Sequence, residues 1–179
     1  MKPDNNHGLE LHIVEGVAAL DIGQLSELAA SCIRETYKPY IPARFLTKEG
    51  PAERKRIWQR IRDDANAYSL VAVKNHRPIA FITAKLDNTN PRLFQADIMS
   101  LYVLLEYQGL GIGKRLFTDM RKILTVSGCR RAKVGVLKEN KSAREFYEKL
   151  GCSMQEEVTY DWHGYSVAQC IYSIELSTE

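Results

Sequence analysis

Three glycines at alternate positions follow a short apolar segment at 101–105 and precede a run with helical periodicity. A helix leaves its first backbone N–H groups without partners and carries partial positive charge at that end, so such a junction can bind a phosphate or pyrophosphate. The amides that could do so belong to Gly109, Gly111, Ile112, Gly113 and Lys114. A tight strand-to-helix turn that binds no ligand is the alternative for the same residues.

The spacing of these glycines departs from two common phosphate motifs. A dinucleotide fingerprint needs G-x-G-x-x-G, and Lys114 stands where its third glycine would be. A P-loop needs a glycine at the position of Gln108 and a serine or threonine at the position of Arg115. The sequence therefore indicates a phosphate-binding loop of another kind.

A second segment, 140–151, combines helix signals with an aromatic face. Asn140 can cap the first helical turn, and Gly151 suits the left-handed position after the last one. One face carries apolar residues at helical spacing, Ala143, Phe146, Tyr147 and Leu150. This face is either core packing alone or, at Tyr147, a phenol held near a ligand.

Together the two segments resemble the GNAT superfamily of acyl-CoA-dependent N-acetyltransferases. The resemblance rests on Q-x-x-G-x-G at 108–113, on the preceding Leu101-Tyr102-Val103, and on N-x-x-A-x-x-F-Y-x-K-x-G at 140–151. It is close over about residues 96–152 and follows element order elsewhere. It implies a single N-acetyltransferase domain over residues 1–179, with its acyl-CoA-binding core at about 96–152. Such an enzyme moves the acetyl group of acetyl-CoA directly to a primary amine.

The resemblance also implies how acetyl-CoA is held. Pantetheine would pair with the backbone of Leu101, Tyr102 and Val103 as an added strand does, and the pyrophosphate would lie on the amides of 109–114. Gln108 would be oriented toward the same group, and Lys114 either adds charge there or is a surface residue. The remaining cofactor residues that the two motifs imply are Leu110, Asn140, Ala143, Phe146, Tyr147 and Lys149.

Acetyl transfer to an amine needs two proton transfers. The resemblance gives the acid as Tyr147, whose phenol has an ordinary pKa of about 10 and can protonate the departing thiolate at neutral pH. The protonated amine must lose a proton before it attacks, and Asp97 is the candidate base. An aspartate at the edge of a strand, with no catalytic role, is the alternative for Asp97.

The acceptor pocket in such folds lies between the first two helices and the terminal hairpin. The aromatic residues there are Tyr37, Tyr40, Phe45 and Trp58 on one side and Tyr160, Trp162 and Tyr165 on the other. Of these, Tyr37, Tyr40, Trp58, Tyr160 and Trp162 are the predicted acceptor contacts. Aromatic walls suit a small amine with an apolar body or an extended peptide, and ordinary packing accounts for them as well. Asp161 beside Trp162 could attract a cation.

Hydrophobic periodicity places these residues on an ordered set of elements. It predicts strands at 9–14, 68–74, 79–86, 96–105, 131–137, 152–161 and 166–175. It predicts helices after Asp21, from Pro51, at 111–126 and at 140–151, and a polar loop at 87–93. The order β-α-α-β-β-β-α-β-α-β-β predicts an α/β fold: a mixed, mostly antiparallel sheet of six to seven strands with helices on both faces, as in GNAT-like acyl-CoA N-acyltransferases.

Composition excludes several other classes of protein. A hydrophobic content of 45% can build one buried core, and a net charge of +3 is too small to imply a nucleic-acid partner. No apolar run approaches the roughly 20 residues of a membrane span, and the polar start of the chain lacks a secretory signal. The cysteines and histidines form no zinc motif and no disulfide framework. We therefore expect a cytoplasmic protein with no metal and no membrane partner.

Two other functions stay open at this stage. A non-catalytic acyl-CoA sensor would keep the glycine loop but would not need the Tyr147 phenol. An acetyltransferase acting on a protein or on aminoacyl-tRNA is compatible with the small basic excess. The terminal strands could pair between chains, so a homodimer and a monomer are both compatible with the sequence.

Overall fold

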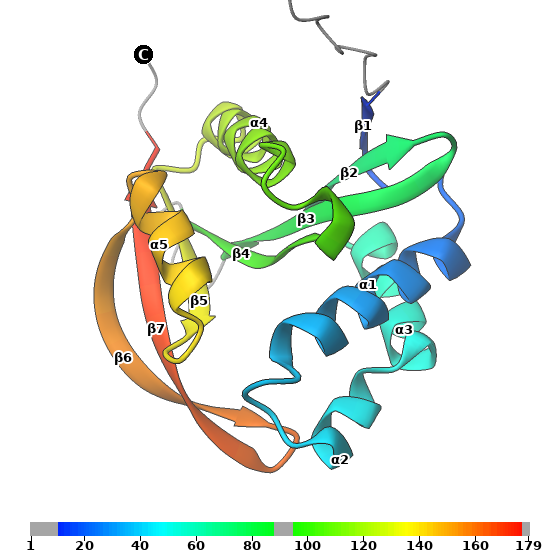
Figure 1. Ribbon diagram of the computed structural model, residues 1–179. Helices are drawn as coiled ribbons and strands as arrows, with labels where there is room; N and C mark the ends of the chain where they lie inside the picture. Colours follow the sequence, from blue (N-terminus) through cyan, green and yellow to red (C-terminus); the bar gives the residue numbers. More distant parts are fainter. Residues whose placement is uncertain (1–10, 88–94, 177–179) are drawn as a thin grey trace, which may run out of the picture.

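A seven-stranded sheet organises the computed structural model, which describes residues 11–87 and 95–176 (Figure 1). The strands are β1 Leu11–Glu15, β2 Ala67–Lys74, β3 Arg77–Asp87, β4 Gln95–Val103, β5 Arg131–Leu137, β6 Ser153–Trp162 and β7 Tyr165–Glu175. Their order across the sheet is β1-β2-β3-β4-β5-β7-β6, and each neighbouring pair is antiparallel except β4 and β5. The predicted mixed, mostly antiparallel sheet is therefore confirmed.

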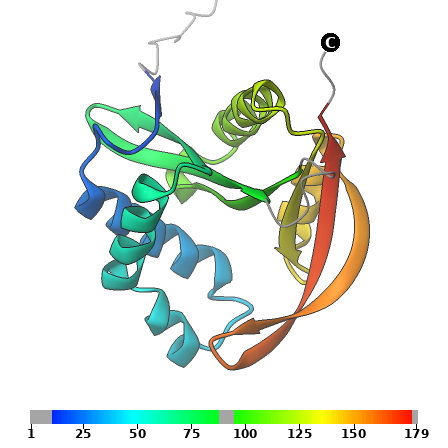
Figure 2. The same ribbon diagram turned by 180° about the vertical axis from the view of Figure 1, so that it is seen from behind.

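Helices cover both faces of this sheet (Figure 1, Figure 2). The α-helices are α1 Ile22–Tyr37, α2 Ala43–Leu46, α3 Pro51–Asp63, α4 Ile112–Val126 and α5 Lys141–Lys149. Two single turns of 3-10 helix, η1 Thr47–Glu49 and η2 Leu105–Tyr107, join them to their neighbours. On one face α1 and α3 enclose a core around Leu25, Trp58 and Phe81, and on the other α4 packs a larger core through its buried apolar stripe.

The helices begin where the capping residues predict. The Asp21 carboxylate accepts the Gln24 backbone N–H at 3.0 Å, and Pro51 occupies the first turn of α3, where its missing N–H costs nothing. The Asn140 side chain accepts the Ala143 N–H at 3.1 Å and starts α5. Local sequence therefore sets the direction of the segments that carry the predicted site residues.

The structure corrects several predicted boundaries. The short helix α2 and the turn η1 were not predicted, because elements this short show no periodicity. Asn75 and His76, with φ of +50° and +62°, form the whole β2–β3 turn, so Arg77 and Pro78 belong to β3. The strand β4 ends at Val103, two residues earlier than predicted. The first two residues of the strand predicted at 9–14, and the predicted loop from residue 88 onward, lie outside the described residues.

The centre of the sheet opens because β4 and β5 separate. These parallel strands pair only where Gln95–Ile98 lies beside Arg131–Val134. The register with β3 shifts by one residue between Ile98 and Ser100, which leaves Met99 in a bulge. Beyond the bulge β4 follows β3 and β5 follows β7, so two facing strand edges have no strand partner.

No helix within the described residues is long and apolar enough to cross a membrane.

The four cysteines are free and buried, as expected for core residues.

Trp58, a predicted acceptor contact, lies in the core, and this placement can be tested by measuring stability. Its side chain is 2% exposed, its indole N–H donates to the Leu25 carbonyl at 3.1 Å, and its ring lies 5.0 Å from that of Phe81. We expect Trp58→Ala to lower the free energy of unfolding by about 3–5 kcal/mol in urea titrations, because it leaves a large cavity. Val126→Ala, at a position 89% exposed, should change it by less than about 0.5 kcal/mol. A loss below 1 kcal/mol for Trp58→Ala would contradict this placement.

Candidate functional site

A cavity of about 850 Å³ lies where β4 and β5 separate. The edge of β4 from Met99 to Val103 forms one wall, and Val134–Val136 of β5 faces it. The start of α4, the α5 residues Ala143, Phe146 and Tyr147, and the polar side of α1 complete the lining. The two motifs, at 108–113 and 140–151 in the sequence, thus meet around one cavity.

The glycine loop presents free amides to this cavity. Gly109 and Gly111 have φ of +75° and +78°, a left-handed backbone that favours glycine. Gly111 is the N-cap of α4 and its carbonyl accepts the Arg115 N–H at 3.0 Å, so the N–H groups of 112–114 precede the first intrahelical bond. Because no side chain in the described part of the chain caps this helix, its N-terminus is available to an anion.

Gln108 has a contact that the sequence analysis did not foresee. Its side-chain Nε2 donates to the Val103 carbonyl at 3.0 Å. One of the two N–H donors of the carboxamide therefore ties the loop to the last residue of β4. This bond helps to hold the α4 N-terminus beside the open edge of β4.

Tyr147 of α5 contributes its side chain to the wall of the cavity. The residue is 6% exposed, and its ring meets Phe117 and Phe146 edge-on at centroid distances of 5.8 and 5.2 Å. Burial is the main cause that raises the pKa of Tyr147, and the neighbouring Tyr37 and Cys152 add to it. The phenol therefore stays protonated at neutral pH and can act as a proton donor.

The position of α5 is set by contacts with β7. Arg144 Nε donates to the Tyr172 hydroxyl at 3.1 Å, and that hydroxyl donates to Glu148 Oε1 at 2.7 Å. Gly151, with φ of +88°, ends the helix as predicted, and the Cys152 N–H donates to the Tyr147 carbonyl at 3.0 Å. These contacts fix the position of α5 and therefore of the Tyr147 side chain in the cavity wall.

Two tyrosines close the cavity on the side of α1. The Tyr102 hydroxyl donates to the Tyr37 hydroxyl at 3.0 Å, and both residues line the cavity. The Trp162 ring, from the end of β6, lies 4.6 Å from the Tyr37 ring, and Tyr160 lies 6.2 Å from Trp162. Helix α1 and the β6–β7 hairpin therefore meet at an aromatic cluster, and of its four residues Tyr37 and Tyr102 line the cavity.

Most of the predicted cofactor residues come together at this cavity. Those that line it are Leu101, Tyr102, Val103, Gln108, Gly109, Gly111, Ile112, Gly113, Asn140, Ala143, Phe146 and Tyr147. Leu110, Lys114 and Lys149 are not among the lining residues. Leu110 is 57% exposed, and Lys149 Nζ reaches Glu145 Oε2 at 3.9 Å on the outer side of α5.

Five other predicted residues do not line the cavity, and these are Asp97, Trp58, Tyr40, Tyr160 and Trp162. Asp97 Oδ1 contacts Lys133 Nζ at 3.3 Å, where β4 and β5 are still paired, and does not line the cavity. Trp58 belongs to the core, and Tyr40 follows α1 without lining the cavity. Asp161 also has a local partner, because its Oδ1 accepts the Gly164 N–H at 2.9 Å in the hairpin turn.

Sequence reasoning predicted Tyr37 on the α1 wall of the cavity but missed the other residues of that wall. Ser31, Cys32, Glu35 and Thr36 line the cavity at positions one helical turn apart. The signal in the sequence was this mostly polar stripe beside the apolar one, although only the tertiary structure shows what it faces. The charged side chains among the lining residues are Glu35 and Glu106, both acidic. Within the described residues, no three His, Cys, Asp or Glu side chains gather as a metal site would need.

Comparison with known proteins agrees with this geometry. The sequence matches the family model described as acetyltransferase (GNAT) family over residues 31–152. The PaiA N-acetyltransferase of Thermoplasma acidophilum, solved in complex with coenzyme A, has the same fold, with a TM-score of 0.73 and 20% identity over 92% of this chain and 98% of that one. An aminoglycoside 6'-N-acetyltransferase complexed with coenzyme A gives a TM-score of 0.71 and 15% identity, over 94% and 98%.

A curated relative is similar over a shorter segment. A stretch of 63 residues is 33% identical to the thialysine N-epsilon-acetyltransferase of Bos taurus. This stretch is 35% of the present chain and only 36% of the length of that relative.

The raised pKa of Tyr147 predicts a specific dependence of stability on pH. The unfolded phenol ionises near pH 10 whereas the folded one does not, so the stability that Tyr147 contributes is complete below about pH 10 and is lost above it. We expect the unfolding free energy of the natural protein to fall relative to that of Tyr147→Phe as the pH rises from about 9 to 11 in urea titrations. Tyr37 and Tyr102, whose pKa values burial also raises, are present in both proteins and cancel. A difference that stays constant over this range would contradict a buried, protonated phenol.

Proposed function

The chain belongs to the acetyltransferase (GNAT) family, and we propose that it is an N-acetyltransferase that moves the acetyl group of acetyl-CoA directly to a primary amine. One observation carries the proposal. The open edge of β4, the uncapped N-terminus of α4 and the Tyr147 phenol meet at a single cavity. We also propose that residues 1–179 act as one domain, with the acyl-CoA-binding core at about 96–152.

The lining residues fit acetyl-CoA. The edge of β4 beyond Ile98 can pair with the amides of pantetheine, since no strand pairs with it there. The amides of Ile112, Gly113 and Lys114 can hold the pyrophosphate, and Phe146 with Ala143 supplies an apolar wall. The bound molecule supplies an activated thioester.

The residues of the cavity then have distinct roles in transfer. A backbone N–H near Val103 stabilises the negative charge that develops on the carbonyl oxygen as the amine nitrogen attacks the carbonyl carbon. As the carbon–sulfur bond breaks, Tyr147 gives its proton to the sulfur, and it regains a proton as the amine loses one. Asp97 stays a prediction for the base without a supporting contact in the cavity, whereas Glu35 and Glu106 are carboxylates that line it.

We further propose that the acceptor is a small, cationic primary amine. The acidic side chains Glu35 and Glu106 suit a positively charged acceptor, although Arg34 Nε lies 3.6 Å from Glu35 Oε1. The tyrosines of the α1 wall can contact the apolar body of such an acceptor. The names of the relatives describe acetylation of thialysine and of aminoglycosides, which both carry amines. A peptide amine is the alternative acceptor.

Binding of acetyl-CoA can be tested without knowledge of the acceptor. A ligand that binds only the folded state adds about 2.7 kcal/mol to the unfolding free energy at 100 times its Kd. We expect acetyl-CoA to raise the melting temperature in calorimetry, with Gly111→Val as a control that blocks the left-handed cap of α4. No shift of the natural protein at millimolar acetyl-CoA would mean that the glycine loop is purely structural.

The role of Tyr147 can be tested by removing one oxygen atom. Tyr147→Phe keeps the ring packing against Phe117 and Phe146 but cannot donate a proton. We expect kcat to fall by about 10²–10⁴-fold, with the Kd of acetyl-CoA unchanged, as thiol release and calorimetry would report.

A matched control for this substitution is Tyr68→Phe. Tyr68 lies in β2, outside the cavity, and its hydroxyl accepts a hydrogen bond from Ser127. Removal of the Tyr68 hydroxyl should leave kcat unchanged. Equal rates for Tyr147→Phe and the natural enzyme would exclude the phenol as the acid.

A further inference from the structure

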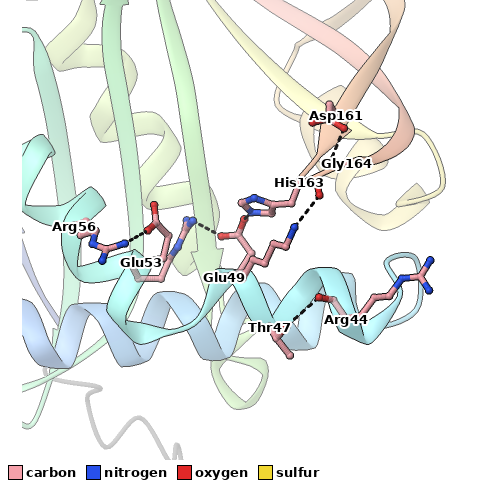
Figure 3. Close-up of polar contacts among 10 residues, drawn as sticks. Arg44, Thr47, Glu49, Glu53, Arg56, Asp161, His163 and Gly164 are labelled. Carbon is pink, nitrogen blue, oxygen red and sulfur yellow. Dashed lines mark hydrogen bonds and ion pairs between the residues drawn. The ribbon is translucent and has the colours of Figure 1, made fainter.

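Glu49 joins two parts of the chain that are more than a hundred residues apart. It lies in η1, its side chain is 11% exposed, and its carboxylate pairs with Arg54 of α3 on one side and with His163 Nε2 on the other. Figure 3 shows it between the helices and the turn that joins β6 to β7. Lys48 Nζ also donates to the His163 carbonyl, at 3.1 Å.

Two aromatic contacts flank these polar ones. Phe45 of α2 stacks on Tyr165 with ring centroids 5.1 Å apart. Tyr37, at the end of α1, meets Trp162 at 4.6 Å. The tip of the hairpin, residues 160–165, therefore docks on the N-terminal helices through one polar cluster and two aromatic pairs.

The hairpin tip has little other support. Strand β7 pairs with β5 only from Gln169 to Glu175, and the Lys138 N–H still donates to the Ala168 carbonyl at 2.9 Å. Beyond this point no third strand of the described residues lies beside the ribbon of Tyr160–Trp162 and Tyr165–Val167. A two-stranded ribbon is only marginally stable in water. Its resting position therefore depends on what it touches at the tip.

The polar cluster at the tip is poorly suited to add stability. Arg54 Nε and Trp162 Nε1 are buried and have no hydrogen-bond partner in the described part of the chain. Buried ion pairs with unsatisfied neighbours contribute little net stability compared with apolar packing, although removing one partner of such a pair is costly. A role in fixing geometry accounts better for its presence.

We propose that Glu49 is a positioning residue for the acceptor amine: by holding Arg54 and His163 it latches the β6–β7 tip onto the helices and fixes Trp162 against Tyr37. The proposal rests on the proposed acetyl transfer, because Tyr37 lines the cavity on its acceptor side. Glu49 itself does not line the cavity and acts through the two aromatic rings. Burial mainly raises the pKa of Tyr37, and the Glu49 charge adds to it, so the carboxylate lies within electrostatic range of this wall.

Steady-state kinetics can separate this role from general stability. Glu49→Gln keeps the shape of the side chain but removes its charge, and we expect it to raise the acceptor KM by about tenfold while the Kd of acetyl-CoA stays the same. His163→Ala should do the same. Because both act on one contact, the double variant should be no worse than the more impaired single one. Glu53→Gln is the matched control, since Glu53 pairs with Arg56 at 3.1 Å on the exposed side of α3.

A second measurement needs no acceptor and no activity. The chain has two tryptophans, and Trp58 is 2% exposed, so quenching of fluorescence by acrylamide reports mainly on Trp162. We expect Glu49→Gln to raise the quenching constant by about twofold, because the tip opens locally, and Glu53→Gln to leave it unchanged.

The outcomes distinguish the latch, meaning the contact by which Glu49 holds the β6–β7 tip on the helices, from the proposed acetyl transfer. A higher quenching constant for Glu49→Gln together with an inactive natural protein would support the latch and overturn the acetyl transfer. An unchanged quenching constant would overturn the latch even in an active enzyme. Additive effects of the two substitutions on KM, or a parallel loss of acetyl-CoA affinity, would overturn it as well.

Discussion

The separation of β4 from β5 after Ile98 is the constraint on which the rest of the structure depends. Backbone N–H and C=O groups along an unpaired strand edge must find partners, and here they face a cavity instead of a neighbouring strand. The two strands are also the parallel pair of the sheet, and each leads into a helix whose N-terminus lies at that cavity. Ligands commonly bind beyond the carboxyl ends of parallel strands, at the point where the chain departs in two directions. One bulge at Met99 thus creates both the strand edge and the space beside it.

The two ends of the cavity differ in the kind of polar groups that line them. At the glycine loop the positive polarity comes from backbone amides at the start of α4, since Lys114 does not line the cavity and the neighbouring lining residue Glu106 of η2 is acidic. Toward α1 the polar groups are side chains, with two hydrogen-bonded tyrosines and the Glu35 carboxylate. An anion is favoured at the first end by the helix dipole, and a cation at the second by charge and by aromatic faces. A single hollow can therefore orient two reactants of opposite charge.

The sequence predicts the loop side of the site well and the opposite side poorly, for a physical reason. Gly111 and Asn140 act through their own turn of helix, so local signals place the starts of α4 and α5 to within a residue. The partners of other residues depend on strand register and on helix packing, which no local pattern reports. Asp97 faces Lys133 because of the parallel register, and Trp58 turns into the core because α3 packs against α1. The contact of Glu49 with His163 spans 114 residues, and the short η1 turn that carries it has no recognisable periodicity.

The main-chain character of the glycine loop has an evolutionary consequence. A contact made by a peptide N–H persists when the side chain of that residue changes, provided that the backbone can still adopt its turn. Only the positions with positive φ, Gly109 and Gly111, are then tightly restricted, and exposed residues such as Leu110 are free to drift. Two acetyltransferases with this fold are only 15 and 20% identical to the chain, so the architecture tolerates extensive change of sequence.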